Sequence, residues 1–239
     1  METNMKHYLL ALSIGTAFLV GCQSPQKQNL IDSNFAFAEQ QLKYAFPKID
    51  EARANESQES KEKRIAKQWG ELTNPRNTEP DGSLRLVPSK DWTSGFFPGE
   101  LWYVYEYTHD PFWKEKAEKH TEMLEREKKN GTTHDMGFKM YCSYGNANRF
   151  EPEDDYQDIL VESARSLCTR FRPKAGVIQS WNGFRSWHGD KVYDFPVIID
   201  NMMNLELLFY ASRVTGDDSF RKVAISHAEH TMKNQARDD

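Results

Sequence analysis

The sequence repeats a two-part pattern in which a strongly apolar segment is followed at once by an amphipathic one. The first copy pairs "GFFPGELWYVYEYT" (95–108) with "FWKEKAEKHTEMLEREKK" (112–129), and the second pairs "IIDNMMNLELLFYASRVT" (198–215) with "SFRKVAISHAEHTMKNQ" (219–235). A helix that is apolar on all sides is buried, whereas an amphipathic helix keeps one face in solvent. The pattern therefore predicts an all-α fold of stacked helical hairpins, with an inner and an outer layer.

The joints of the two copies also match residue by residue, at an offset of 107 positions. Asp110 and Asp217 can cap the outer helices, and Gly216 can end the second inner helix. Two similar hairpins in an ordinary helical fold would show the same joints, so that alternative stays open. The matching residues are Thr108, Asp110, Trp113, Lys114, Ala117 and His120 in the first copy, and Thr215, Asp217, Phe220, Arg221, Ala224 and His227 in the second.

The remaining segments add helices and one extended stretch. We expect an amphipathic helix over 29–46, a fraying helix and then a long loop over 51–91, and helices over 135–147 and 153–171. "GVIQSW" (176–181) is a short strand candidate. We interpret the two matching histidines as hydrogen-bonded core residues without a chemical role.

The N-terminus is typical of an exported lipoprotein. "MKHYLLALSIGTAFLVGC" has a positive start and an apolar stretch of about 13 residues, shorter than the roughly 20 that span a bilayer. We predict a signal peptide over 1–21, a lipid on Cys22, a polar tether over 22–28 and part of one helical domain over 29–239. The chain would then be anchored by lipid in a bacterial cell envelope, in the outer membrane or facing the periplasm. An ordinary signal peptide with a chance cysteine is the alternative.

Several classes of function lose support from the sequence. The net charge is −5 and no basic stripe is present, which disfavours nucleic-acid binding. Cys142 and Cys168 lack the spacing of a zinc or redox site and are interpreted as small buried residues. No HExxH, phosphate loop or GxSxG motif occurs, so we predict neither a metal nor a cofactor.

One carboxylate stands in an apolar run and needs a reason to be there. Asp200 follows three apolar residues, and a half-buried carboxyl at that point should have a raised pKa. Asp135 is expected at the same rim, before another inner helix, although a helix cap explains it equally well. Two neighbouring carboxyls, one protonated and one charged, are the usual requirement for acid catalysis on a sugar.

Tryptophans in loops supply candidate surfaces for sugar rings. Trp92, Trp181 and Trp187 lie beside glycine or in short polar loops, where an exposed indole face suits the apolar face of a sugar. The alternative is that each indole covers the core. Cations that could meet an acidic sugar, or could simply be solvated, follow in the same region: Arg185, His188 and Lys191.

Four motifs together resemble a known family. "DWTSGFFPGELW", "HDMGF", "AGVIQSW" and "IIDNMMNLELL" resemble, in this order, the unsaturated glucuronyl hydrolases of glycoside hydrolase family 88. The resemblance covers about residues 90–239 and implies an (α/α)6 barrel. Because the chain has room for only about half of that barrel's helices, we expect about the first half of the barrel, as in a truncated family member.

The resemblance also implies an activity and a site. Family members act on oligosaccharides that polysaccharide lyases leave with an unsaturated terminal uronic acid, without a cofactor. Asp200 matches the family's general acid/base, and Asp135 matches the carboxylate that positions the substrate. The positions that line the pocket fall on His134, Trp92 and Trp181.

Three other functions remain open from the sequence. An unsaturated rhamnogalacturonyl hydrolase would share the fold and the chemistry. A non-catalytic sugar-binding lipoprotein would keep the tryptophan loops without turnover. A purely structural hairpin scaffold would leave Asp200 unexplained.

Overall fold

The computed structural model of the protein describes residues 25–237, and their side chains from residue 28 onward. The predicted signal peptide (1–21) and the lipid-bearing Cys22 lie outside the described residues. Residues 25–28, the end of the expected tether, belong to the first helix, α1 (Pro25–Ala54). In the described part of the chain, no helix combines the length and apolar character needed to cross a membrane.

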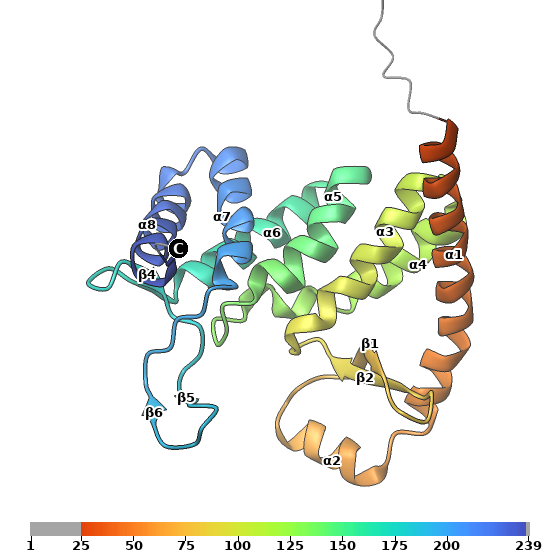
Figure 1. Ribbon diagram of the computed structural model, residues 1–239, viewed down its shortest axis with the longest axis horizontal. Helices are drawn as coiled ribbons and strands as arrows, with labels where there is room; N and C mark the ends of the chain where they lie inside the picture. The colour runs from red at the N-terminus through yellow and green to blue at the C-terminus, as the bar shows by residue number, and fades with distance from the viewer. Residues whose placement is uncertain (1–24, 238–239) are drawn as a thin grey trace, which may run out of the picture.

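Three helical hairpins stand side by side along the long axis of the molecule (Figure 1). Each pairs one inner with one outer helix, so the predicted two-layer all-α architecture is confirmed. The inner helices are α3 (Phe96–Thr108), the π-helix η3 (Gly137–Gly145) continued by α5 (Asn146–Phe150), and α7 (Asn201–Thr215). The outer helices are α4 (Pro111–Glu122), α6 (Asp154–Cys168) and α8 (Asp218–Gln235). Of two short 3-10 helices, η1 (Trp92–Gly95) leads into α3 and η2 (Glu125–Lys129) follows α4.

The joints of the first and third hairpins are built alike, as the sequence repeat predicts. Asp110 and Asp217 each accept a hydrogen bond from the amide two residues later, at 2.9 and 2.8 Å. The inner helices end on residues with left-handed backbone, His109 (φ 54°) and Gly216 (φ 73°). The same local chemistry therefore turns the chain from the inner to the outer layer twice.

The core lies between the two layers, and both repeat histidines belong to it. His120 and His227 are 3% and 0% exposed, and each is hydrogen-bonded, as predicted. His120 Nδ1 lies 2.6 Å from Asn74 Oδ1, and His227 Nδ1 accepts the Ile178 amide at 3.0 Å. Burial lowers the pKa of His120 to about 3 and that of His227 to about 4, so both rings are neutral at neutral pH.

The prediction of a long loop before residue 91 was wrong. A short helix, α2 (Gln58–Ala66), is followed by a β-hairpin of β1 (Leu72–Thr78) and β2 (Leu84–Pro88). Pro75 and two shifts of register interrupt the ladder, which removes the alternating pattern by which a strand is recognised. The hairpin is attached to the helices through its own buried Asn74. The Asn74 side chain donates to the Ser94 carbonyl at 2.8 Å and is hydrogen-bonded to His120.

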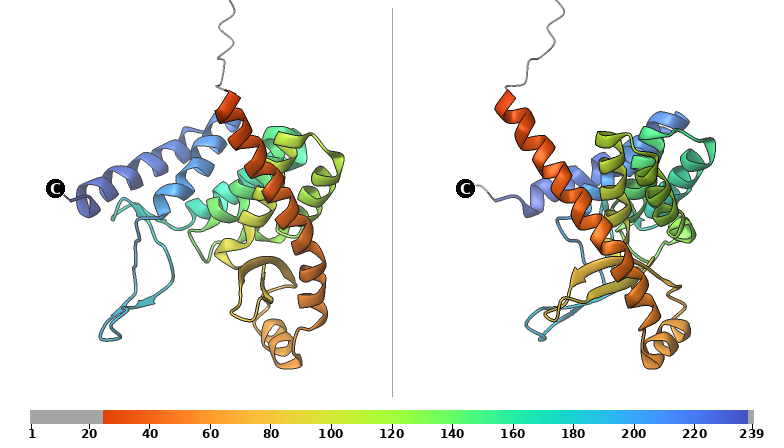
Figure 2. Two further views of the ribbon diagram at one scale, coloured as in Figure 1. Left: turned by 45° about the vertical axis from the view of Figure 1, so that its right-hand side comes forward. Right: turned by 90° about the vertical axis from the view of Figure 1, so that its right-hand side faces the viewer.

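Helix α1 is longer than the predicted 29–46 and is only partly buried. It runs along the edge of the first hairpin (Figure 2) and presents Phe35 and Leu42 to the core. Trp113 Nε1 donates to Glu39 on this helix at 2.9 Å. Three other apolar side chains of the segment 29–46 are exposed: Leu30, Phe37 and Tyr44.

Two further segments differ in detail from their predictions. The expected α-helix over 135–147 is a π-helix from Gly137, whose wider turns are common at functional sites. The expected strand over 176–181 is reduced to β4 (Val177–Ile178), which pairs with β3 (Phe171–Arg172). Beyond it, β5 (Phe184–Arg185) and β6 (Val192–Tyr193) form a hairpin that extends away from the helices (Figure 2).

Gly137 lets the inner helices η3 and α7 approach closely, so Gly137→Ala should destabilise the fold. A Cβ at this position would lie 2.6 Å from the Asn204 Cα, and neither backbone can move without separating the helices. We expect a loss of about 3 kcal/mol, measured as the free energy of unfolding in urea. Gly183→Ala is the control, because its Cβ would meet nothing nearer than 3.8 Å. Equal stability of the two variants would contradict the prediction.

Candidate active site

Three ionisable side chains meet where η3 and α7 begin. His134 and Asp135 belong to the loop before η3, and Asp200 immediately precedes α7. His134 Nε2 lies 3.2 Å from Asp135 Oδ1 and 3.8 Å from Asp200 Oδ1. The structure thus brings both predicted carboxylates to the same rim of the inner layer, with the predicted histidine between them. We call these three residues the acid cluster.

Neither carboxylate serves as a helix cap. Asp200 stands one residue before α7 with helical backbone angles (φ −66°, ψ −14°) and makes no capping hydrogen bond. The Asp135 carboxylate instead accepts a hydrogen bond from the Thr133 hydroxyl, which lies before the helix. The interpretation of Asp135 as a helix cap is therefore wrong.

The three side chains differ in their access to water. The His134 side chain is 0% exposed, that of Asp135 11% and that of Asp200 40%. Burial raises the pKa of Asp200; His134 opposes that rise, and Asp135 adds to it. Burial lowers the pKa of His134 against the pull of both carboxylates. Asp200 therefore holds its proton to a higher pH than an ordinary aspartate, as the sequence predicts, while His134 is neutral at neutral pH.

The acid cluster contains buried polar atoms without a hydrogen-bond partner among the described residues. They are His134 Nδ1 and Nε2, Asp200 Oδ1, and Oδ1 of the neighbouring Asn201. The contact of His134 with Asp135, although only 3.2 Å long, lacks the geometry of a hydrogen bond. Buried polar groups are seldom left unbonded, so these atoms are available to a ligand or to water.

A short backbone stretch, residues 178–180, holds the acid cluster in place. The Ile178 carbonyl accepts a hydrogen bond from Asn201 Nδ2 at 3.1 Å, next to Asp200. The Ser180 carbonyl accepts the His134 amide at 3.2 Å, and the Ser180 hydroxyl accepts the Ile198 amide at 3.0 Å. One extended stretch thus bonds to both segments that carry the cluster.

The two predicted pocket tryptophans lie in different relations to the cluster. The Trp181 ring stands edge-on to the His134 ring, with centroids 5.7 Å apart. The Trp92 ring is 42% exposed and packs on Phe138, three residues after Asp135, at 5.7 Å. The structure therefore joins Trp181 directly to the cluster and places Trp92 one residue layer away from it.

Sequence reasoning missed four polar residues around the cluster. Asn201 and Asn204 are fully buried, and Asn204 Oδ1 accepts the Phe138 amide at 2.9 Å. Both stand in the same apolar run as Asp200, which was a usable signal. Lys139 and Glu127 form a buried ion pair at 3.3 Å behind the site. Nothing in the pattern distinguishes these two from the many solvated charges of amphipathic segments.

The acid cluster also has the composition of a cation site. One nitrogen and one oxygen from each carboxylate lie within 4.8 Å of one another, and a neutral imidazole with carboxylates suits zinc. The sequence predicts no metal, and the acid–base chemistry proposed below requires none. Chelation in the activity assay separates these two uses of the same atoms.

The acid cluster lies apart from a large cavity of the molecule. A cavity of about 990 Å³ lies on the outer layer, between η2 and α6, and none of its lining residues belongs to the acid cluster. Its wall is dominated by charged side chains, among them Glu125, Lys128 and Glu162. Size alone therefore does not mark the candidate site, whereas unpartnered polar atoms do.

No protein-family model matches the sequence. An unsaturated glucuronyl hydrolase of Formosa agariphila is 40% identical over 237 residues, which is 96% of this chain and 54% of that protein. The crystal structure of an unsaturated glucuronyl hydrolase specific for heparin superimposes with a TM-score of 0.65 at 43% identity, over 74% of this chain and 46% of that one. The chain is homologous to the unsaturated glucuronyl hydrolases over about half of their length.

A second solved structure agrees with this assignment. The unsaturated glucuronyl hydrolase of Bacillus sp. GL1, which degrades glycosaminoglycan, matches with a TM-score of 0.63 at 31% identity, over 74% of this chain and 46% of that one. The chain spans about half the length of the curated relative from Formosa agariphila. Its paired helices are accordingly about half of an (α/α) barrel, as predicted.

Because its pKa is raised, ionisation of Asp200 destabilises the folded chain. Asp200→Asn should therefore stabilise the chain at neutral pH but not at acid pH. The folded chain holds this proton more tightly than the unfolded chain, whose pKa is near 3.8. Stability is therefore lost as the pH rises from 3.8 through the folded pKa, and the variant escapes that loss. Solvent screens the half-exposed group, so we expect a gain in Tm of about 2 °C near pH 7.

The control for this experiment is Asp194→Asn, at an exposed aspartate of the β5–β6 hairpin. The Tm difference between Asp200→Asn and the parent should vanish as the pH falls toward 3.8. A difference that stays the same at acid and neutral pH would show that the substitution acts through packing and not through charge.

Proposed function

We propose that the protein containing this chain removes the terminal 4,5-unsaturated glucuronic acid from oligosaccharides that polysaccharide lyases release. The observation that carries the proposal is the acid cluster: two carboxylates on either side of a buried neutral histidine, one of them with a raised pKa. In this arrangement Asp200 is the candidate proton donor and Asp135 the second carboxylate beside it, which is the pairing that acid catalysis on a sugar needs.

The first step is protonation of the double bond. The unsaturated ring is a vinyl ether, in which the ring oxygen donates electrons into the C4=C5 bond. Asp200 gives its proton to C4, and the positive charge that results is shared between C5 and the ring oxygen. The negative charge of Asp135 stabilises this cation, and the buried surroundings strengthen that attraction.

The second step is the addition of water. The Asp200 carboxylate now takes a proton from a water molecule as its oxygen bonds to C5, which restores the acid and leaves a hemiketal. The bond between C5 and the ring oxygen then breaks, giving a ketone at C5 and a free hydroxyl at C1. Loss of the remaining sugar chain from C1 leaves an aldehyde, so no bond at the anomeric carbon is attacked directly.

The other site residues position the ring. His134 is fully buried, with Nε2 3.2 Å from Asp135 and 3.8 Å from Asp200, so it acts by holding the two carboxylates in place. Trp181 covers one side of His134, and Trp92 offers an exposed indole face nearby. Aromatic faces suit the apolar faces of sugar rings.

Two alternatives differ in their support. An unsaturated rhamnogalacturonyl hydrolase would use the same cluster, but the matching curated relatives are glucuronyl and chondroitin disaccharide hydrolases. A non-catalytic sugar-binding protein would not need a carboxyl with a raised pKa, which destabilises the fold when it ionises. Both observations favour the glucuronyl hydrolase.

The proposal predicts a fall in ultraviolet absorbance when the chain meets an unsaturated glucuronyl disaccharide, because hydration removes the absorbing double bond. Asp200→Asn should lower the rate at least about a hundredfold, since it cannot transfer the proton. The chelator EDTA should leave the rate unchanged. The matched control is Asp194→Asn, which should keep the parent rate.

Three results would contradict parts of this account. A rate that survives Asp200→Asn would remove Asp200 from the chemistry. Loss of activity with EDTA, restored by zinc, would assign the acid cluster to a metal. Binding of the disaccharide without turnover in the parent chain would favour the sugar-binding alternative.

We also propose that Cys22 carries a lipid that anchors the protein in a bacterial cell envelope. The support is the sequence alone: a positive start, a short apolar stretch and the ending Leu19-Val20-Gly21-Cys22. When the chain is expressed in a bacterium, Cys22→Ser should move it from the membrane fraction to the soluble fraction. A chain that stays in the membrane fraction after this substitution would contradict the proposal.

A further inference from the structure

A continuous row of rings leads from the acid cluster out along the β5–β6 hairpin. The Trp181 ring lies 5.7 Å from the His134 ring, the Phe184 ring 5.5 Å from Trp181, and the Trp187 ring 5.2 Å from Phe184, all between centroids. The three aromatic residues belong to one segment, residues 181–195, which we call the aromatic hairpin. Its inner end is therefore part of the candidate active site.

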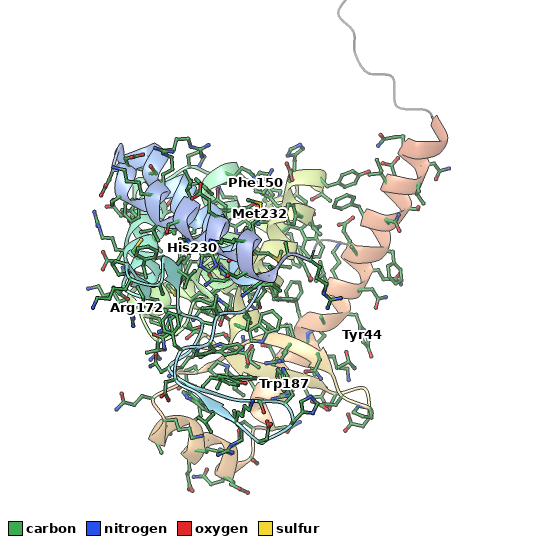
Figure 3. The ribbon with its side chains drawn as sticks, turned by 60° about the vertical axis from the view of Figure 1, so that its left-hand side comes forward. Tyr44, Phe150, Arg172, Trp187, His230 and Met232 are labelled. Atoms are coloured by element: carbon green, nitrogen blue, oxygen red, sulfur yellow. The ribbon has the colours of Figure 1, made fainter. Side chains whose placement is uncertain are left out.

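The aromatic hairpin has a defined shape at its tip. Ser186 donates its amide to the Lys191 carbonyl at 2.8 Å, and Gly189 donates to the Ser186 carbonyl at 2.8 Å. The positive φ of Gly189 (75°) closes this turn. The hairpin stands away from the helices in two views (Figures 1 and 2), and Trp187 lies on this outlying part of the chain (Figure 3).

Trp187 does not contribute to the core. Its side chain is 88% exposed, the largest exposure among the large apolar residues of the described chain. Covering an indole normally gains about 2 kcal/mol or more, so this exposed ring can add affinity for a ligand that covers it. Phe184 contacts this ring at an interplanar angle of 73°, and most of the indole surface stays accessible.

The charges of the aromatic hairpin indicate what kind of occupant fits. Between residues 182 and 195, two basic and two acidic residues balance: Arg185 and Lys191 against Asp190 and Asp194. Arg185 Nη1 donates a hydrogen bond to the Gly189 carbonyl at 3.2 Å. A site for sulfate or carboxylate groups would carry a net positive charge, so this surface suits the faces of sugar rings and not their charges.

We propose that the aromatic hairpin is a platform for the sugar rings that follow the terminal unsaturated uronic acid, so that the site prefers oligosaccharides longer than a disaccharide. The proposal rests on the proposed function, because it takes the terminal ring to lie at the acid cluster. The first ring lies at the cluster beside Trp181, and later rings of the same oligosaccharide stack on Phe184 and Trp187. Stacking on exposed aromatic faces adds affinity without requiring any one charge pattern.

Calorimetry with two probes tests this platform. The probes are the unsaturated disaccharide and tetrasaccharide from a lyase digest of hyaluronan, which carries no sulfate. Binding is measured to the Asp200→Asn chain, so that no turnover occurs. We expect the tetrasaccharide to bind about fivefold more tightly than the disaccharide, and the ratio to be the same at low and high salt.

Trp187→Ala in the same background should reduce this ratio to about one while leaving the disaccharide affinity unchanged. Trp187→Phe should restore most of the ratio, because it keeps a ring. The matched control is Tyr44→Ala, another exposed aromatic residue, which lies on α1 at the opposite end of the helical layers (Figure 1) and should keep the full ratio.

The outcomes separate this proposal from the proposed function. Suppose that Trp187→Ala removes the tetrasaccharide preference, while the parent chain causes no loss of ultraviolet absorbance. That result would support the platform and contradict the hydrolase. Normal turnover with equal affinity for both probes would overturn the platform alone. A tetrasaccharide preference that disappears at high salt would overturn the platform in favour of charge recognition. If Trp187→Ala changed only the mass of the chain in sedimentation, and not the binding ratio, the exposed indole would instead mark a contact between two copies.

Discussion

The position of the acid cluster depends on the backbone of Ile178, which is bonded on both sides. Its amide donates to His227 Nδ1 on the outer helix α8, and its carbonyl accepts Asn201 Nδ2 on the inner helix α7. Two residues later, Ser180 bonds to the His134 amide and to the Ile198 amide. Because the layers and both halves of the site meet at this stretch, moving one would disturb the other.

The same device recurs at the other end of the molecule, which explains why the repeat includes a histidine. In the first hairpin, His120 on α4 bonds to the buried Asn74 of strand β1, as His227 on α8 bonds to Ile178 of strand β4. Each outer helix thus uses a neutral imidazole to hold an extended segment against the layers. The His227 bond needs an uncharged ring, because a protonated ring could not accept from the Ile178 amide. His120 instead donates its Nδ1–H to the Asn74 side-chain oxygen, and burial keeps both rings neutral because a charged ring would be costly to bury.

The helical hairpins and their joints could be predicted from the sequence because periodicity and capping are local properties. The proximity of Asp135 and Asp200 followed from that layout, since both were expected just before inner helices, at one rim. The β1–β2 hairpin and the π-helix could not, since they depend on contacts with distant residues. Asn74 is fixed by a histidine 46 positions away. Gly137 is required by its approach to Asn204 in another helix. Buried charges such as Lys139 look like surface residues until the fold places them.

The exposed fraction of the side chain rises from His134 through Asp135 and Asp200 to Trp187, and the two ends of this series meet different physical demands. Proton transfer to carbon needs an acid whose pKa has been raised, and partial burial raises it. Binding a long, polar oligosaccharide needs wide, accessible faces that water can leave at little cost. A deeper Asp200 would lose its access to the attacking water, whereas a buried Trp187 would have no face to offer. In the proposed function, the chemistry therefore takes place at the edge of the inner layer, and the binding surface lies beyond it.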